Sequence, residues 1–294
     1  MIAPDDYRFL ADLLKRGSGL ALGDGKEYLL ESRLPPVATR FGMADLPALV
    51  GALRTRSTPD LVKAVCDAMT TGETLFFRDN APFQALEKQL IPEILPRARA
   101  QGRAIRIWCA ACSTGQEPYS IAMIMDQMKG VLGTTRVEIV ASDYAAPTLA
   151  RAKEGIYNQF EVQRGLPVQL LVKHFKQVPA GFQVTDALRN SITFREQNLL
   201  QPFTALGTFD VVFVRNVLIY FDSNTKRDVL ERIARQLTPG GTVLLGGTEN
   251  TLGLTDALVR LPGATTSLYR RPGDIAAAAG AAAAAGPAAG KAVA

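Results

Sequence analysis

Apolar residues recur at roughly helical spacing through the first 69 residues of the chain. Glycines and prolines interrupt the pattern, which predicts several short helices in place of one long helix. Asp45 and Thr58 stand where two of these helices would begin, and both residue types cap helix N-termini. The helical segments are expected at residues 7–14, 28–34, 37–41, 46–53 and 59–69. Residues 1–69 are therefore predicted to form a small helical domain.

Beyond a joining segment at residues 70–102, which includes a helix near residues 82–99, apolar strands alternate with helical stretches. A helix expected at residues 224–237 ends in Thr238-Pro-Gly-Gly, a strong stop signal. This alternation predicts an α/β fold over residues 103–272, with a mainly parallel sheet covered on both faces. Strands are expected at residues 105–109, 137–142, 191–196, 210–214 and 242–246, with a closing hairpin near 257–261 and 266–270.

Two stretches depart from the alternation of strands and helices. Residues 156–190 read as an insertion that contains a helix and a short β-piece. Residues 273–294 are mostly alanine with some glycine, so they have little to bury and we expect them to be disordered.

The composition is that of an ordinary globular protein, with 47% hydrophobic and 21% charged residues among 294. No stretch approaches the roughly 20 apolar residues that span a bilayer, so no membrane insertion is expected. The N-terminus has no signal-peptide pattern, which favours a cytoplasmic location. The net charge of +5 is mild, and aromatic residues do not alternate with basic ones, so we expect no nucleic acid partner.

Basic residues gather in one part of the helical domain, where few acidic residues offset them. Such a stretch is most often a solvated face, but it would also suit docking against an acidic protein helix. The candidates for docking are Arg33, Arg40, Arg54 and Arg56, and Lys63 lies at the end of the same stretch.

The three cysteines do not make a disulfide framework, although Cys109 and Cys112 form a C-x-x-C pair. A zinc site needs two further ligands, and only Cys66 and His174 are available, so no metal is expected. A thioredoxin-like redox pair stays open. Two small residues in a tightly packed turn are the favoured interpretation.

The strand at residues 105–109 leads through a turn of small residues with Gly115 into a helix that begins near Pro118. Such a turn lets a ligand approach free backbone N–H groups. The next strand ends in Asp143, which could bind ribose hydroxyls. A G-x-G-x-x-G motif is absent, which weakens an NAD interpretation. Glu117 could cap the helix or, with Asp143, favour a cationic ligand with a ribose, a description that fits S-adenosylmethionine.

A further apolar strand ends in Arg215-Asn216, and Tyr220 follows about one turn later. Open α/β sheets bind ligands at the carboxyl ends of their strands, so this polar pair is a candidate for the same site. The alternative is that both residues only cap the next helix. Asn198 and Leu199 occupy the matching position after another predicted strand.

Three long segments carry a resemblance to a known family, namely residues 70–79, 109–120 and 215–221. They read TTGETLFFRD, CAACSTGQEPYS and RNVLIYF, and they resemble the chemotaxis receptor methyltransferases of the CheR family in the same order. The similarity runs from about residue 5 to 272. It implies a helical N-terminal domain and a Rossmann-like class I methyltransferase sheet with a small β-subdomain insertion.

The resemblance also implies an activity, the transfer of the methyl group of S-adenosylmethionine to glutamate side chains of chemoreceptors, with S-adenosylhomocysteine as product. Family members usually have asparagine where this chain has Gly72, so one side-chain contact to the cofactor is in doubt. The implied cofactor positions are Gly72, Thr74, Arg78, Glu117, Asp143, Asn198, Leu199, Arg215 and Asn216.

This reaction is expected to require no acid or base catalyst from the protein. A glutamate carboxylate has a pKa of about 4.3 and is already ionised near neutrality, so it needs no general base. The enzyme's task is alignment and exclusion of water. Arg78 and Tyr220 are expected to touch the substrate end as positioning catalytic residues, while a role for His174 is not favoured.

The implied partner is the cytoplasmic helical bundle of a chemoreceptor, with its acidic methylation helices. The loop at residues 177–183 is short, which favours action without a receptor pentapeptide tether. Two other functions stay open: a non-catalytic adaptor that binds S-adenosylmethionine or another nucleotide, and a small-molecule or RNA methyltransferase on the same fold.

Overall fold

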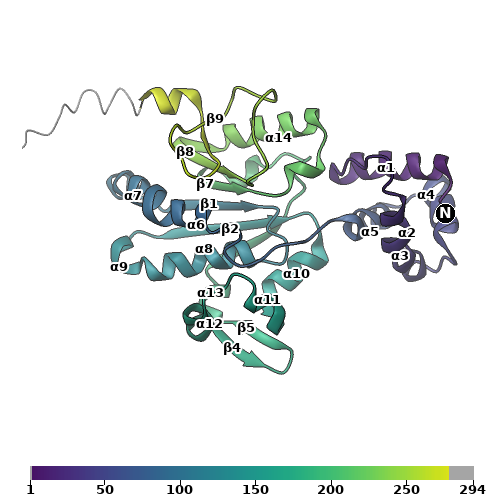
Figure 1. The fold of residues 1–294 in the computed structure, drawn as a ribbon, viewed down its shortest axis with the longest axis horizontal. Coiled ribbons are helices and arrows are strands. Elements are labelled where there is room, and N and C mark those ends of the chain that lie inside the picture. The colour runs from purple at the N-terminus through teal and green to yellow at the C-terminus, as the bar shows by residue number, and fades with distance from the viewer. Residues whose placement is uncertain (1, 278–294) are drawn as a thin grey trace, which may run out of the picture.

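The computed structural model describes residues 2–277, and its first part is a bundle of five helices (Figure 1, purple). Their apolar faces share one core, in which Leu10, Leu14 and Leu30 are fully buried. The helices expected from the apolar spacing are confirmed, with ends that shift by a few residues. They are α1 Pro4–Ser18, α2 Glu27–Arg33, α3 Pro35–Arg40, α4 Leu46–Thr55 and α5 Pro59–Met69.

Both predicted caps of this domain are confirmed. The Asp45 carboxylate accepts a hydrogen bond of 2.8 Å from the Ala48 N–H at the start of α4. The Thr58 hydroxyl accepts one of 3.3 Å from the Leu61 N–H at the start of α5. Each bond satisfies a backbone donor that the helix itself leaves without a partner.

A linker at residues 70–80 connects the bundle to a second helical stretch, which the sequence predicts as one helix. The structure divides this stretch into α6 Ala81–Ala85, a π-helical turn η1 Leu86–Leu90 and α7 Ile91–Ala100. Pro92 is the second residue after the π turn and has no N–H to donate, so the α-helical hydrogen-bond ladder is interrupted there.

The centre of the molecule is a seven-stranded sheet in the order β6-β2-β1-β7-β8-β10-β9. Strands β6, β2, β1, β7 and β8 are parallel neighbours, while β10 runs antiparallel to both β8 and β9. The mainly parallel sheet and its closing hairpin are therefore confirmed. The strands are β1 Ile105–Ala110, β2 Val137–Asp143, β6 Ile192–Glu196, β7 Phe209–Val214, β8 Leu237–Leu245, β9 Val259–Arg260 and β10 Leu268–Arg270.

Helices bury both faces of this sheet, as expected for a parallel sheet (Figure 1). Alternate residues of β1 divide between two cores: Ile107 joins one and Trp108 the other. The covering helices are α8 Gln116–Gln127, α9 Lys129–Leu132, α10 Ala146–Glu154, α13 Asp186–Arg189 and α14 Ser223–Arg235, together with α6 and α7, and a 3-10 turn η2 Thr204–Leu206 precedes β7. The chain continues from β1 to one side and returns at β7 on the other, which opens a crevice at the carboxyl ends of these strands.

The predicted insertion forms a small subdomain with its own antiparallel sheet, in the order β3-β5-β4. Its strands are β3 Ile156–Tyr157, β4 Phe175–Val178 and β5 Gly181–Val184, and its helices are α11 Gln159–Gln163 and α12 Val168–His174. Tyr157 attaches it to the main domain, because its hydroxyl donates a 2.6 Å hydrogen bond to the Thr114 carbonyl and its ring packs edge-on against Phe76.

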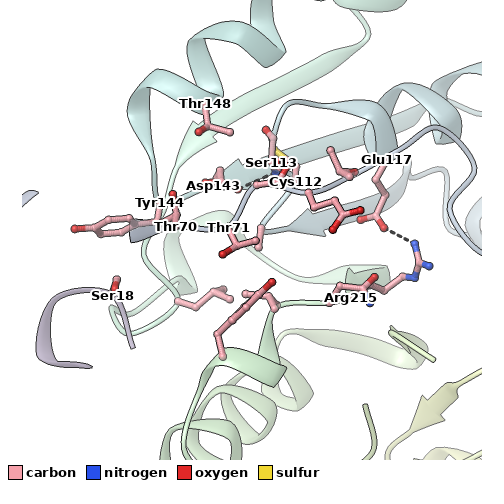
Figure 2. A pocket seen from close by; sticks show the side chains of 18 of the residues that line it. Ser18, Thr70, Thr71, Cys112, Ser113, Glu117, Asp143, Tyr144, Thr148 and Arg215 are labelled. Atoms are coloured by element: carbon pink, nitrogen blue, oxygen red, sulfur yellow. Dashed lines mark hydrogen bonds and ion pairs between the residues drawn. The ribbon is translucent and has the colours of Figure 1, made fainter. Parts of the chain in front are cut away.

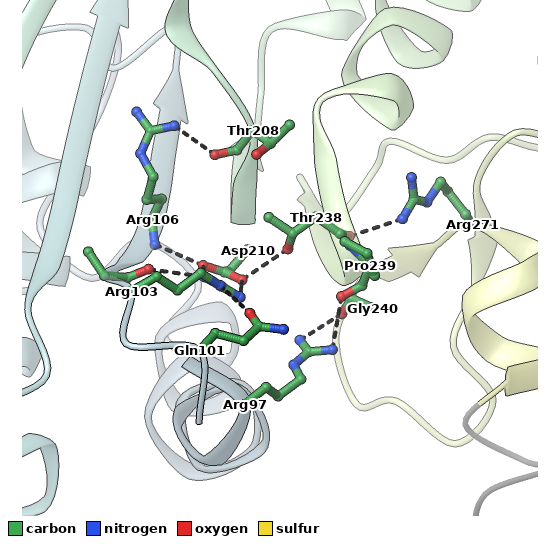
Figure 3. A network of polar contacts seen from close by, with 11 residues as sticks. Arg97, Gln101, Arg103, Arg106, Thr208, Asp210, Thr238, Pro239, Gly240 and Arg271 are labelled. Carbon is green, nitrogen blue, oxygen red and sulfur yellow. Dashed lines mark hydrogen bonds and ion pairs between the residues drawn. The ribbon is translucent and has the colours of Figure 1, made fainter. Parts of the chain in front are cut away.

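A polar network lies at the end of the sheet where strands β7 and β8 begin (Figure 3). The carboxylate of Asp210 is fully buried and accepts two hydrogen bonds of 2.8 Å from the guanidinium of Arg103. It also accepts bonds from the Arg106 N–H and the Thr238 hydroxyl. Burial alone would raise the pKa of Asp210, but these donors hold it below its usual value.

The chain ends, as far as the structure describes it, in a short helical turn at residues 272–277. The Ala-rich tail expected at residues 273–294 lies outside the described residues from position 278 onward. Within residues 2–277, no helix is both long and apolar enough to cross a membrane.

Candidate functional site

One cleft opens at the carboxyl ends of the central strands, between the sheet, the linker and the end of α1 (Figure 2). Parallel strands present their carboxyl ends at the same edge, so residues far apart in the sequence meet here. All the positions expected to hold the cofactor or touch the substrate line this cleft. They are Gly72, Thr74, Arg78, Glu117, Asp143, Asn198, Leu199, Arg215, Asn216 and Tyr220.

The turn after β1 forms one wall of the cleft and has an unusual backbone. Ala111 and Ser113 adopt positive φ angles of 59° and 51°, and Gly115 follows with 97°. This conformation aims the Ser113 N–H at Asp143, whose Oδ2 accepts a 2.8 Å hydrogen bond, while Oδ1 accepts one of 3.0 Å from the Ala145 N–H. The carboxylate of Asp143 is thereby fixed at the end of β2, beside the cleft.

Burial raises the pKa of Asp143, and the backbone donors offset this only in part. A carboxylate oxygen can accept two hydrogen bonds, so each oxygen of Asp143 keeps acceptor capacity beyond its backbone donor. The geometry thus suits a ligand that donates two hydroxyl groups, as a ribose does.

Glu117 and Arg215 form a direct ion pair at one side of the cleft (Figure 2). Arg215 is almost fully buried and pairs with Glu117 at 2.8 Å and with Asp79 at 2.6 Å, and it also donates to the Arg78 carbonyl at 3.0 Å. Burial raises the pKa of Glu117 despite the nearby guanidinium. Both residues were expected to contact the ligand, and in the structure they bind each other in an ion pair.

The acidic residues outnumber the basic ones along the cleft. Glu73, Glu117 and Asp143 line it together with Arg78 and Arg215. Glu117 is paired with Arg215, and Glu73 lies 3.5 Å from Arg164, so the lining has a small excess of negative charge, which suits a ligand that carries positive charge.

The linker forms the opposite wall. Ser113 donates a 2.7 Å hydrogen bond to the carbonyl of Gly72, and a Cβ atom at Gly72 would lie 3.2 Å from the Ser113 hydroxyl oxygen. Arg78 donates to the Glu73 carbonyl at 3.0 Å. Within residues 2–277 Arg78 makes no ion pair, which leaves much of its guanidinium for an anionic group. Thr74 lines the cleft between them.

The helical domain closes the cleft from the side. The amide of Asn198 donates to the Gly17 carbonyl at 2.8 Å, and the Ala21 N–H donates to the Tyr220 carbonyl at 2.9 Å. Lys63 on α5 reaches the Tyr144 carbonyl at 3.1 Å and Glu196 at 3.0 Å. The segments after β2, β6 and β7 are therefore all tied to the N-terminal domain.

Several lining residues were not anticipated from the sequence. They include Ser18 at the end of α1 and Leu20 after it, Thr148 on α10, and Tyr144 and Phe221 in the loops. Tyr144 directly follows the end of β2, and that position was a usable signal for it. The sequence carries no signal that the end of α1 would line the cleft, because a local pattern does not show which part of the helical domain packs against the methyltransferase domain.

The four docking candidates lie on the helical domain outside the cleft. Arg33 turns back to the linker and donates to the Met69 carbonyl at 2.9 Å. Arg54 pairs with Asp6 at 3.1 Å and stacks over Phe9. Arg40 and Arg56 are exposed to solvent.

The thiols of Cys66, Cys109 and Cys112 are free and buried, and burial raises the pKa of each. Buried thiols with raised pKa values are poor nucleophiles, which agrees with a packing role for the C-x-x-C pair. His174 is buried in the subdomain, 3.6 Å from Asp126, and burial lowers its pKa. It does not line the cleft.

Comparison with known families accounts for nearly the whole described chain. The model of the CheR methyltransferase all-alpha domain matches residues 5–70, and that of the CheR methyltransferase SAM binding domain matches residues 72–266. The chain belongs to the CheR methyltransferase family. The resemblance in the three motifs is thereby confirmed, as is the fold class. The chain is an S-adenosylmethionine-dependent methyltransferase, and most residues that line the cleft belong to its SAM binding domain.

Curated relatives of this CheR family member come from bacteria and are similar over most of their length. Chemotaxis protein methyltransferase 1 of Vibrio cholerae is 41% identical over 87% of this chain and 92% of its own. Chemotaxis protein methyltransferase 1 of Pseudomonas aeruginosa is 42% identical over 85% and 92%. Chemotaxis protein methyltransferase Cher2 of Pseudomonas putida is 40% identical over the same shares.

Proposed function

We propose that this protein transfers the methyl group of S-adenosylmethionine to glutamate side-chain carboxylates of chemoreceptors in the cytoplasm, and so sets sensory adaptation. The observation that supports this most is the convergence of Glu117, Asp143 and Arg78 in one cleft of a CheR-family fold. Membership of the family gives the class of reaction, and the names of its relatives point to chemotaxis.

The residues of the cleft fit S-adenosylmethionine by their chemistry. Asp143 would hold the ribose hydroxyls through its remaining acceptor capacity. The acidic lining around Glu117 suits the sulfonium and ammonium groups, and Arg78 suits the carboxylate. When bound, the cofactor supplies a methyl group on a positively charged sulfur, which is a good leaving group.

The protein's own contribution is positioning. The incoming glutamate is ionised near neutral pH, so no general base is required. Tyr220 and Arg78 line the cleft and would orient the carboxylate oxygen, since each can donate hydrogen bonds. A tight bidentate grip by Arg78 would reduce the nucleophilicity of the oxygen, so its role is alignment and not activation.

The partner surface follows from charge. Arg40 and Arg56 are exposed and form no ion pair among residues 2–277, and they would attract the acidic methylation helices of a receptor's cytoplasmic bundle. The subdomain hairpin between β4 and β5 turns within two residues, 179 and 180, which supports action without a pentapeptide tether.

The test is a transfer assay with radiolabelled S-adenosylmethionine and cytoplasmic fragments of candidate chemoreceptors. We expect label on the fragment that is released by mild base, because carboxyl methyl esters are base-labile. Replacement of the methylated glutamates by alanine serves as the control and should abolish the label. Base-stable label, or none with any receptor of the source organism, would contradict the proposal.

A further inference from the structure

A single carboxylate, that of Glu249, joins two loops at the edge of the cleft. It is buried, with 6% of the residue exposed. Its Oε1 accepts hydrogen bonds from the N–H groups of Val217 at 3.0 Å, Leu218 at 2.8 Å and Ile219 at 3.3 Å. Its Oε2 accepts bonds from Asn216 at 2.8 Å and, within its own loop, from Gly246 at 2.7 Å.

This arrangement is a nest of backbone donors around an anion that the chain itself supplies. A buried carboxylate is costly unless it is fully hydrogen-bonded, and here five N–H groups meet that need. In return, Glu249 satisfies four consecutive N–H groups of the segment that follows β7.

The held segment is the one that enters the cleft. It begins with Asn216, whose φ of 57° is rare for a residue other than glycine, and ends with the 3-10 turn η3 Leu218–Tyr220. Asn216, Val217 and Tyr220 line the cleft. A backbone in such a conformation persists only where surrounding contacts over-determine it.

The approach of the two loops leaves no room for a side chain. A Cβ atom at Gly246 would lie 2.6 Å from Oε2 of Glu249 and 3.0 Å from the backbone nitrogen of Asn216. Glycine at the end of β8 is therefore required for the carboxylate to reach its donors.

We propose that Glu249 is a positioning residue for methyl transfer, which fixes the backbone of residues 216–220 so that Asn216 and Tyr220 face the cofactor and the substrate. This inference rests on the proposed function for its kinetic consequence. Its structural consequence, the order of residues 216–219, can be measured without substrate or cofactor.

The test compares Glu249→Gln and Glu249→Ala with the wild-type protein. The amide of glutamine keeps one acceptor oxygen, but its NH2 group faces the other backbone donors, so part of the nest is lost. We expect faster hydrogen exchange at residues 216–219 in the cofactor-free Glu249→Gln protein, with unchanged exchange in β1. At saturating cofactor, kcat should fall about tenfold in the glutamine variant and about a hundredfold in the alanine variant, since small misplacements of reacting groups have effects of this size.

A matched control is Glu231→Gln on α14, where the carboxylate accepts a hydrogen bond from the Thr255 hydroxyl and, among residues 2–277, no other. This variant should leave both the hydrogen-exchange rates at residues 216–219 and kcat within twofold of wild type. If Glu249→Ala does not fold, the glutamine variant decides. Wild-type exchange at residues 216–219 in a folded Glu249→Gln protein, or kcat within twofold of wild type, would overturn the inference. Should wild-type enzyme methylate no receptor, the proposed function fails, while the exchange result still tests Glu249.

Discussion

Asp143 and Glu117 give the cleft its negative charge, and burial raises the pKa of both. A carboxyl group with a raised pKa takes up its proton at a higher pH than an exposed one, which titrates near 4. As the pH falls through these raised pKa values the cleft loses negative charge, and its attraction for a sulfonium falls with it.

The residue-scale prediction is a pH-dependent preference between cofactor and product. As the pH falls from 8 towards the usual carboxyl range near 4, we expect the affinity for S-adenosylmethionine to fall more steeply than that for S-adenosylhomocysteine, which lacks the positive sulfur. Titration calorimetry over this range measures both affinities, and Asp143→Asn should flatten the difference. Parallel curves for the two ligands in the wild-type protein would count against the prediction.

Arg78 and Tyr220 allow a kinetic prediction. Arg78→Ala and Tyr220→Phe should each lower kcat by about tenfold to a hundredfold, while the affinity for S-adenosylmethionine changes by less, because both side chains align the reacting groups. Steady-state kinetics with a receptor fragment and calorimetry with the cofactor give the two numbers. Unchanged turnover in both variants would remove these residues from the reaction.

At this scale the sequence predicted which residues would meet but not how they are engaged. Asp143, Arg215 and Asn198 follow strand ends, and that position alone brings them to one edge of the sheet. The hydrogen-bond and ion-pair partners of these residues could not be predicted from the sequence. Glu249 follows β8, about 30 residues from the N–H groups it binds, and no local pattern marks such a contact.

At the scale of elements, the sheet depends on the buried carboxylate at the start of β7. The folded-state pKa of Asp210 is lowered, so its contribution to stability is present at neutral pH and is lost as the pH falls through that lowered value, below about 4. Asp210→Asn should cost about 3 kcal/mol at pH 7, since it leaves Arg103 without its partner.

Chemical denaturation of wild type and Asp210→Asn at pH 7 and near pH 3 tests this prediction. The difference in unfolding free energy should shrink as the pH falls towards the lowered pKa of Asp210, because protonation removes the charge that Arg103 binds. Glu87→Gln on the π turn provides a control at a half-buried carboxylate without an ion pair among residues 2–277. An equal difference at both pH values would contradict the account.

The element pattern itself was largely predictable. Short apolar runs followed by small or polar residues marked β1, β2, β6 and β7 to within a residue at each end. Two features had no clear signal. The Thr238-Pro-Gly-Gly segment read only as a helix stop, but it is also the first part of β8, which pairs with β7 through a register shift. The π turn at residues 86–90 has an ordinary helical composition.

At the scale of the whole molecule, the helical domain helps to build the cleft. Lys63 is surrounded by Asp67, Glu196 and the Tyr144 carbonyl, and Lys15 pairs with Asp222 at 2.7 Å. The sequence placed Lys63 at the end of a basic stretch, but its ammonium turns inward to the segments after β2 and β6. Composition could not reveal this, because the relative placement of two domains is set by tertiary packing.

This placement predicts that Lys63→Met weakens cofactor binding about threefold to tenfold, although Lys63 does not line the cleft. The loops that carry Asp143 and Asn198 would lose a shared anchor. Lys26→Met, an exposed lysine of the same domain, is the matched control. Calorimetry should show wild-type affinity for S-adenosylmethionine in Lys26→Met but not in Lys63→Met. Equal affinities in the two variants would contradict a contribution of the helical domain to cofactor binding.

The central claim is that the acid-lined cleft at the carboxyl edge of the sheet holds S-adenosylmethionine. Titration calorimetry of the wild-type protein and of Asp143→Ala with this cofactor tests it most directly. The account predicts one molecule bound per chain and an affinity at least tenfold lower in the variant, because the ribose loses its acceptor while the fold is kept. Absence of binding to the wild type, or equal affinity in Asp143→Ala, would contradict it.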